Sequence, residues 1–126
     1  MAIENAPERL VRYGDEDLQE FRELIYKKLK ESKEEFQHYE EQIKSFNDNN
    51  KKNYSGLEDG SGTMEKEYLN QMASRMIQYI KHLEGAAARI ENKTYGICRK
   101  TGKLINKQRL KLVPHATLSI DAKRNS

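Results

Sequence analysis

The stretch YGICRKTGKLINKQRL, residues 95–110, has the spacing of a metal-binding turn but lacks most of the ligands. A zinc knuckle reads Cys-x-x-Cys-Gly, because two thiolates on one tight turn supply half of a tetrahedral site. Here Cys98 is followed three residues later by Thr101 and then by Gly102. Cys98 is the only cysteine, and His115 is the one further ligand type nearby. The sequence therefore predicts no metal site, and it predicts that Cys98 is a small buried apolar residue.

No other residues are spaced for catalysis. The three histidines, His38, His82 and His115, are dispersed along the chain. Neither a Ser-His-Asp nor a Cys-His arrangement can be read, and no Gly-rich phosphate loop opens a helix after a strand. The sequence predicts that the protein is not an enzyme.

The composition favours long helices with a thin apolar seam. The chain has 126 residues, of which 36% are hydrophobic and 34% are charged, and its mean hydropathy is −1.00. This is too polar for a compact globule, and fits either a disordered chain or an extended helical one. No signal peptide and no apolar run of membrane-spanning length is visible, so we expect a cytoplasmic protein with a reduced thiol and no membrane contact.

The charges are distributed unevenly. From Lys93 onward there are nine basic residues, and Asp121 is the only acid, whereas acids outnumber bases in the rest of the chain. Such a basic end can orient a protein on a polyanion or on a partner of mixed charge. Because Tyr95 is the only aromatic residue there, the sequence predicts at most weak, salt-sensitive contact with nucleic acid and no sequence-specific DNA binding.

Hydrophobic periodicity predicts a first long helix after a lead-in at residues 1–14. Gly14 breaks the preceding segment, Asp15 can cap a helix, and Glu16 and Asp17 suit its positive end. From Leu18, spacings of four and three alternate in a heptad pattern. The seam positions are Leu18, Arg22, Ile25, Leu29, Ser32, Phe36, Tyr39, Ile43 and Phe46.

A polar stretch, NDNNKKNYSGLEDGSG at residues 47–62, predicts a loop through which no helix should continue. A second helix is expected from about Thr63 to the poor helix formers of residues 91–96. Its seam positions are Leu69, Met72, Met76, Tyr79, Leu83, Ala87 and Ile90.

The predicted fold is mainly α: a long antiparallel coiled-coil hairpin over residues 15–92, with its tip at residues 47–62, and a small head over residues 93–126. The tip is acidic through Asp48, Glu58 and Asp59, and a helix of about 30 residues would carry it about 45 Å from the head. A tip held this far from the head is better suited to contacting a partner than to forming a binding pocket. The head is expected to have a small core of Ile97, Leu104, Ile105, Leu110, Leu118 and Ile120.

This order of segments resembles that of the DksA/TraR family of bacterial transcription regulators. The family's head reads Tyr/Phe-Gly-x-Cys-x-x-Cys-Gly, then Ile, Arg-Leu, Pro and Leu-Cys-x-x-Cys-Lys. The chain matches it with YGICRKTG, Ile105, Arg109 and Leu110, Pro114, and LSIDAK. The four metal positions of the family's zinc finger then fall on Cys98, Thr101, Ser119 and Ala122.

The resemblance implies a zinc-finger-like head of treble-clef type that has lost three of its four thiolates. We expect Thr101 and Ser119 to form hydrogen bonds across the vacated space and Ala122 to pack into it. We therefore predict a metal-free head, although zinc is typical of the family.

The resemblance also implies a partner, since family members insert the coiled coil through the secondary channel of RNA polymerase, often together with ppGpp. The family's tip motif, Asp-x-x-Asp-x-Ala, falls on Ser55, Glu58 and Gly60, or after a one-residue shift on Gly56, Asp59 and Ser61, so one acid is kept. Arg75 falls on an arginine through which family members contact the polymerase, and Lys123 falls on a lysine associated with ppGpp. Two other ppGpp-associated positions fall on His82 and Val113, which differ from the family's residues there. Two alternatives stay open: a coiled-coil module for another protein partner, and a weak nucleic-acid binder acting through the basic head.

Overall fold

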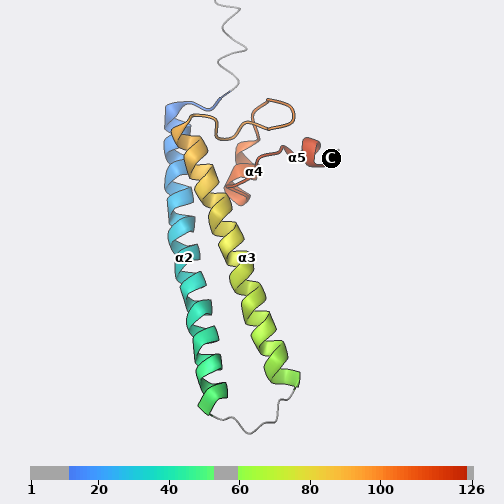
Figure 1. Ribbon diagram of the computed structural model, residues 1–126. Helices are drawn as coiled ribbons and strands as arrows, with labels where there is room; N and C mark the ends of the chain where they lie inside the picture. Colours follow the sequence, from blue (N-terminus) through green and yellow to red (C-terminus); the bar gives the residue numbers. More distant parts are fainter. Residues whose placement is uncertain (1–11, 53–59, 125–126) are drawn as a thin grey trace, which may run out of the picture. The chain divides into compact units, whose positions relative to one another are not determined.

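The structure, a computed structural model, describes residues 12–52 and 60–124, and these form four helices (Figure 1). They are α2 (Asp15–Lys52), α3 (Gly60–Glu91), α4 (Lys107–Leu112) and α5 (Ile120–Arg124). The chain divides into two compact units. The head unit lies within Met1–Leu29 and His82–Ser126, and the hairpin unit is Lys30–Lys81.

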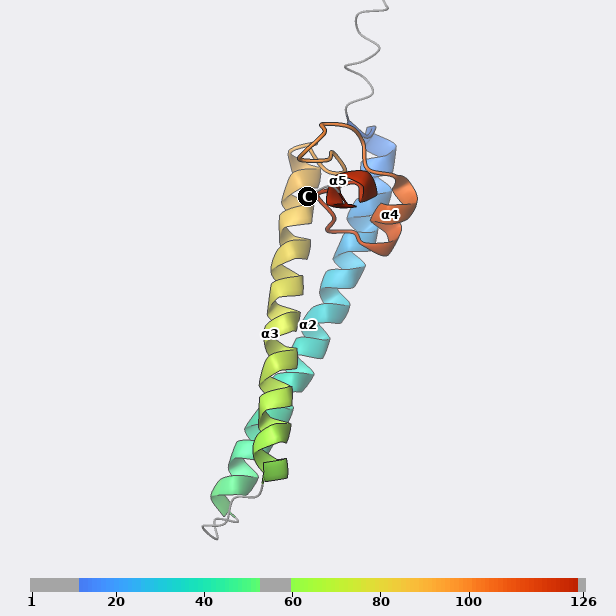
Figure 2. The same cartoon turned by 90° about the vertical axis from the view of Figure 1, so that its right-hand side faces the viewer.

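In the hairpin unit, the two long helices lie side by side and run in opposite directions, as Figures 1 and 2 both show. Phe36 of α2 and Ala73 of α3 line one hollow, and closer to the other end of the unit the charge of Glu31 acts on Tyr79. The predicted antiparallel helical hairpin is therefore confirmed. The predicted seams are confirmed as well, because each of their positions in both units is buried or half-buried.

The predicted loop over residues 47–62 was too long at both ends. Helix α2 continues to Lys52 and α3 already begins at Gly60. Asn, Asp and Gly disfavour a helix by only about 1 kcal/mol each or less, and a helix that is already nucleated and packed can continue through them. Asp48 accordingly lies on α2, whereas Glu58 and Asp59 lie outside the described residues.

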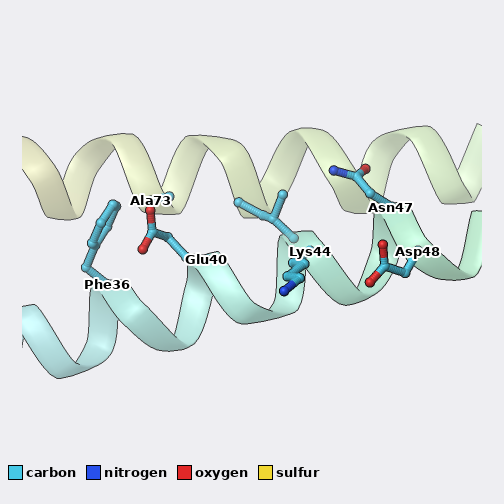
Figure 3. A pocket seen from close by; sticks show the side chains of 7 residues that line it. Phe36, Glu40, Lys44, Asn47, Asp48 and Ala73 are labelled. Carbon is cyan, nitrogen blue, oxygen red and sulfur yellow. The ribbon is translucent and has the colours of Figure 1, made fainter.

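A shallow hollow lies between the helices of the hairpin unit, as Figure 3 shows. Phe36 is directed toward α3, where Ala73 contributes only a methyl group, so the facing side chains do not fill the space between them. The remaining lining residues are Glu40, Ile43, Lys44, Asn47 and Asp48. This wall of alternating charges on successive turns of α2 is typical of a solvated helix surface.

The head unit packs the short helices α4 and α5 and their connecting segments on the paired ends of α2 and α3 (Figure 1). Of the predicted head core, Ile105 and Leu110 are fully buried, and Ile97, Leu104 and Leu118 are half-buried. Ile120 was wrongly assigned to this core, because it is 46% exposed at the start of α5. No helix in residues 12–52 or 60–124 is both long and apolar enough to cross a membrane.

Candidate functional site

The turn around Cys98 keeps the backbone of a zinc knuckle. The amide of Cys98 donates to the carbonyl of Lys103, and the amide of Gly102 donates back to the carbonyl of Cys98, each at 2.8 Å. Gly102 has a φ of 74°, a conformation that glycine adopts at little cost. Ile97 and Leu104 form an isolated antiparallel bridge below the turn. Residues 97–104 thus form a short hairpin with Gly102 in its turn.

Ser119 and Ala122 were predicted to occupy the second pair of metal positions, and Ser119 lies against this turn. The amide of Ser119 donates to the Sγ of Cys98 at 3.4 Å, and the two side chains lie 3.7 Å apart, Sγ to Oγ. The Oγ of Ser119 accepts from the amide of Ala122 at 3.2 Å, so Ser119 caps α5. Ala122 is buried at 4% exposure. Ser119 thus links the turn at Cys98 to the start of α5.

These hydrogen bonds change the acidity of Cys98. The side chain of Thr101, followed by the backbone amide of Ser119, lowers the pKa of the thiol to about 6, because both donate to the thiolate. The side chain itself is buried, at 1% exposure. Of the other three expected metal positions, Thr101 and Ser119 form hydrogen bonds with this sulfur, and Ala122 is hydrogen-bonded to Ser119. Because reactivity requires access as well as a lowered pKa, the buried sulfur of Cys98 serves here as an internal hydrogen-bonding group.

The donor set does not fit a structural zinc ion. Such sites use four thiolate or imidazole ligands, and Thr101, Ser119 and Ala122 supply none of them. His115, the one further ligand type near in sequence, stacks on His82 with ring centroids 5.4 Å apart. Among the described residues, no group of three or more His, Cys, Asp or Glu side chains is placed to hold a metal. A metal-free head remains a prediction, and we derive no function from zinc.

Acids of the first turn of α2 hold the head segment. Asp15 pairs with Lys93 at 2.7 Å and Asp17 pairs with Lys107 at 2.9 Å. The hydrogen bond from Lys93 lowers the pKa of Asp15, and the hydrogen bond to Asp17 raises the pKa of Lys107. Exposed pairs of this kind contribute little to stability, because the solvent screens their charges.

An aromatic core that the sequence did not reveal joins the lead-in to the head. Tyr13 is buried, and its hydroxyl donates to the carbonyl of Ile105. Its ring lies edge-on to Phe21, with centroids 5.7 Å apart, and Phe21 packs on Tyr95 at 5.2 Å. The hydroxyl of Tyr95 donates to the carbonyl of Pro114 at 2.8 Å. The available signal was an aromatic residue just before a helix start, a position that often packs back on its own helix.

Gly96 is required where the lead-in crosses the head. Its φ is 80°, and a Cβ built on it would lie 2.6 Å from two ring carbons of Tyr13 and 3.2 Å from Leu110. The glycine of the YG pair therefore allows two segments of the chain to approach closely.

A positively charged group of side chains surrounds His115. Burial lowers its pKa, and the charges of His82, Arg89 and Arg109 lower it further. Arg109 is held in place, because its Nε donates to the carbonyl of Leu118 at 2.9 Å. The neutral form of His115 is thus the one that fits this environment.

Arg75 and Lys123 are the remaining predicted site residues. Arg75 is exposed on α3 in the hairpin unit, and Lys123 is exposed on α5 in the head unit. Among the ppGpp-associated positions that depart from the family, His82 is exposed and Val113 is half-buried.

Comparison with known proteins agrees with the head and with the fold. Residues 93–124 match the prokaryotic dksA/traR C4-type zinc finger family. No curated protein matches the sequence. A solved structure, that of the transcription factor DksA2 from Pseudomonas aeruginosa, matches with a TM-score of 0.73 and 22% sequence identity over 86% of this chain and 81% of that chain. The head is thus similar in sequence to the zinc finger of the DksA/TraR family, and the fold is similar to that of DksA2.

Proposed function

We propose that the protein is a non-enzymatic transcription regulator that binds bacterial RNA polymerase and inserts its helical hairpin through the secondary channel. The observation that carries most weight is the fold match to a transcription factor over 86% of the chain, together with a family-type head. The residues that line the hollow include no serine, cysteine or histidine, so this feature does not favour an enzyme.

In this proposal the hairpin and the head supply affinity, and the tip supplies the effect. A polymerase active centre contains Mg²⁺ and a strong local field, so a carboxylate from Glu58 or Asp59 delivered there can perturb charge close to the reacting groups. Arg75 is the proposed contact with the polymerase, and ppGpp is a proposed effector through Lys123.

The nucleic-acid alternative is less well supported. Two of the basic residues of the head, Lys93 and Lys107, are engaged by Asp15 and Asp17 of α2. Non-specific affinity for nucleic acid depends on the number of Lys and Arg side chains that neutralise phosphates. A lysine that is paired with an acid of α2 is less available for this role.

Affinity purification of the tagged protein from its host tests the proposal. We expect the subunits of RNA polymerase to co-purify in near-stoichiometric amounts after nuclease treatment. Recovery of nucleic acid without polymerase, or of an unrelated protein in stoichiometric amount, would contradict it.

A further inference from the structure

Two arginines of the head unit are held by the segment that connects α4 to α5. The amide of Arg99 donates to the carbonyl of Thr117 at 2.8 Å. The Nε of Arg109, on α4, donates to the carbonyl of the next residue, Leu118, at 2.9 Å. Neighbouring residues of one segment therefore bring these two arginines together, although the arginines belong to different parts of the head.

A third arginine, Arg89, reaches the same segment from α3. Burial lowers the pKa of His115, which lies in the segment, and the charges of Arg89 and Arg109 lower it further. Burial also lowers the pKa of Arg89, and the charge of Arg99 acts in the same direction. Charges influence each other in this way only at short range, so Arg89, Arg99 and Arg109 form one group, which we name the arginine cluster.

The guanidinium of Arg89 has an unused hydrogen-bond donor. Arg89 is half-buried, and its Nη2 is shielded from solvent and has no hydrogen-bond partner in the described part of the chain. A buried donor without a partner is costly, and in native proteins a bound water or ion often satisfies such a group. None of the three arginines forms a salt bridge within residues 12–52 or 60–124. The cluster therefore has no counter-ion among the described residues.

The chemistry of the cluster indicates an anion. A guanidinium binds an oxyanion through two parallel hydrogen bonds, and several arginines can share one tetrahedral ion. Arg99 is exposed and Arg109 is only half-buried, so a small ion can reach the cluster from solvent. A compact ion fits three cations from three segments better than an extended ligand does.

We propose that the arginine cluster binds a small inorganic oxyanion, phosphate or sulfate, which connects α3, the turn around Cys98 and α4. The ion accepts hydrogen bonds from Arg89 and balances the three charges, and it thereby stabilises the head. This site does not depend on the proposed function, and it does not include Lys123, through which ppGpp is proposed to act.

Thermal melts of the full chain in phosphate and in chloride test the site. Phosphate at about 10 mM is compared with chloride at the same ionic strength and pH, and we expect the melting temperature in phosphate to be higher by about 3 °C or more. Sulfate should give a similar rise, because the cluster recognises charge and tetrahedral shape.

Three variants separate binding at the cluster from the general stabilisation that excluded salts give to any protein. Arg89→Gln removes one charge of the cluster and should abolish the rise. Arg124→Gln removes an exposed cation of α5, outside the cluster, and should keep the full rise. Because loss of the half-buried Arg89 can disturb folding, Arg99→Gln tests the cluster at an exposed position. This variant should fold as the wild type does by circular dichroism and still show a reduced rise.

Three outcomes would overturn the proposal. The first is a wild-type protein whose melting temperature is the same in phosphate, sulfate and chloride. The second is an undiminished rise in both Arg89→Gln and Arg99→Gln. The third is a rise with ppGpp but none with phosphate or sulfate, because the cluster would then serve a nucleotide. None of these melts involves RNA polymerase, so the proposed function is tested separately.

Discussion

The Sγ of Cys98 lies 3.7 Å from the Oγ of Ser119, although 21 residues separate the two in sequence. The fold thus brings together two of the four positions that the resemblance assigns to a metal site. In this chain hydrogen bonds connect these positions.

Metal removal should therefore leave the head intact. Because a single thiolate is within reach, we expect incubation with a strong chelator to leave the thermal melting curve unchanged. Elemental analysis should find no stoichiometric zinc. One equivalent of tightly bound zinc per chain would contradict this prediction.

Restoring the ligands should restore the metal. The triple variant Thr101→Cys, Ser119→Cys and Ala122→Cys would complete a four-thiolate set with Cys98. We expect this variant to bind one zinc ion and to melt at a higher temperature with zinc than after chelation. Failure to bind zinc would show that the backbone has relaxed away from the metal geometry.

Gly96→Ala should destabilise the head. The added Cβ would lie 2.6 Å from ring carbons of Tyr13, and φ at this position is 80°, so strain and overlap combine. We expect a loss of about 2 kcal/mol or more in the free energy of unfolding, measured by denaturant titration. Gly102→Ala is the matched control, because its φ is 74° but no atom lies within 4 Å of the added Cβ. Equal losses in the two variants would show that the contact with Tyr13 is unimportant.

Stability should fall in mild acid because of His115. Its pKa is lowered in the folded state by burial and by neighbouring positive charge, relative to an ordinary value of 6.5. The unfolded chain therefore binds this proton more readily, so the stabilisation is complete above the unfolded pKa and is lost as pH falls through the folded pKa.

Thermal melts at about pH 7.5 and about pH 5.5, on either side of the ordinary histidine pKa, measure this effect. We expect His115→Asn to reduce the drop in melting temperature between them. His38→Asn, at an exposed position of α2, should reproduce the wild-type drop. If the His115 variant shows the same drop in melting temperature as the wild type, the prediction is wrong and other groups cause the pH dependence.

The helices were predictable from sequence because apolar spacing alone determines which face is buried. Every seam position is covered to some degree, including Ser32, which is only 5% exposed. The loop bounds were not predictable, since packing sustains α2 through Asn and Asp residues that usually end helices. The contact of Lys93 with Asp15 joins residues 78 apart, and no local pattern indicates such a pairing. The burial of Tyr13 likewise depends on Gly96 in a segment far along the chain.

The acidic tip is the proposed origin of the effect on transcription. Replacing both acids, Glu58→Ala with Asp59→Ala, should leave polymerase binding within a few-fold and abolish the effect in an in vitro transcription assay. The matched control is Glu34→Ala with Glu35→Ala, which removes two adjacent exposed acids from α2. If the tip variant binds polymerase and remains fully active, the acidic-tip mechanism is wrong and these carboxylates serve only to keep the turn soluble.

The position of the tip in the complex is the central claim, and localised cleavage measures it most directly. When Fe²⁺ replaces Mg²⁺ in the polymerase active centre, the radicals that it generates cut nearby polypeptide. The account predicts that the bound chain is cut within or beside residues 53–59 and that excess Mg²⁺ suppresses the cut. A chain that binds polymerase but is left intact, or is cut only within residues 93–124, would contradict insertion of the hairpin through the channel.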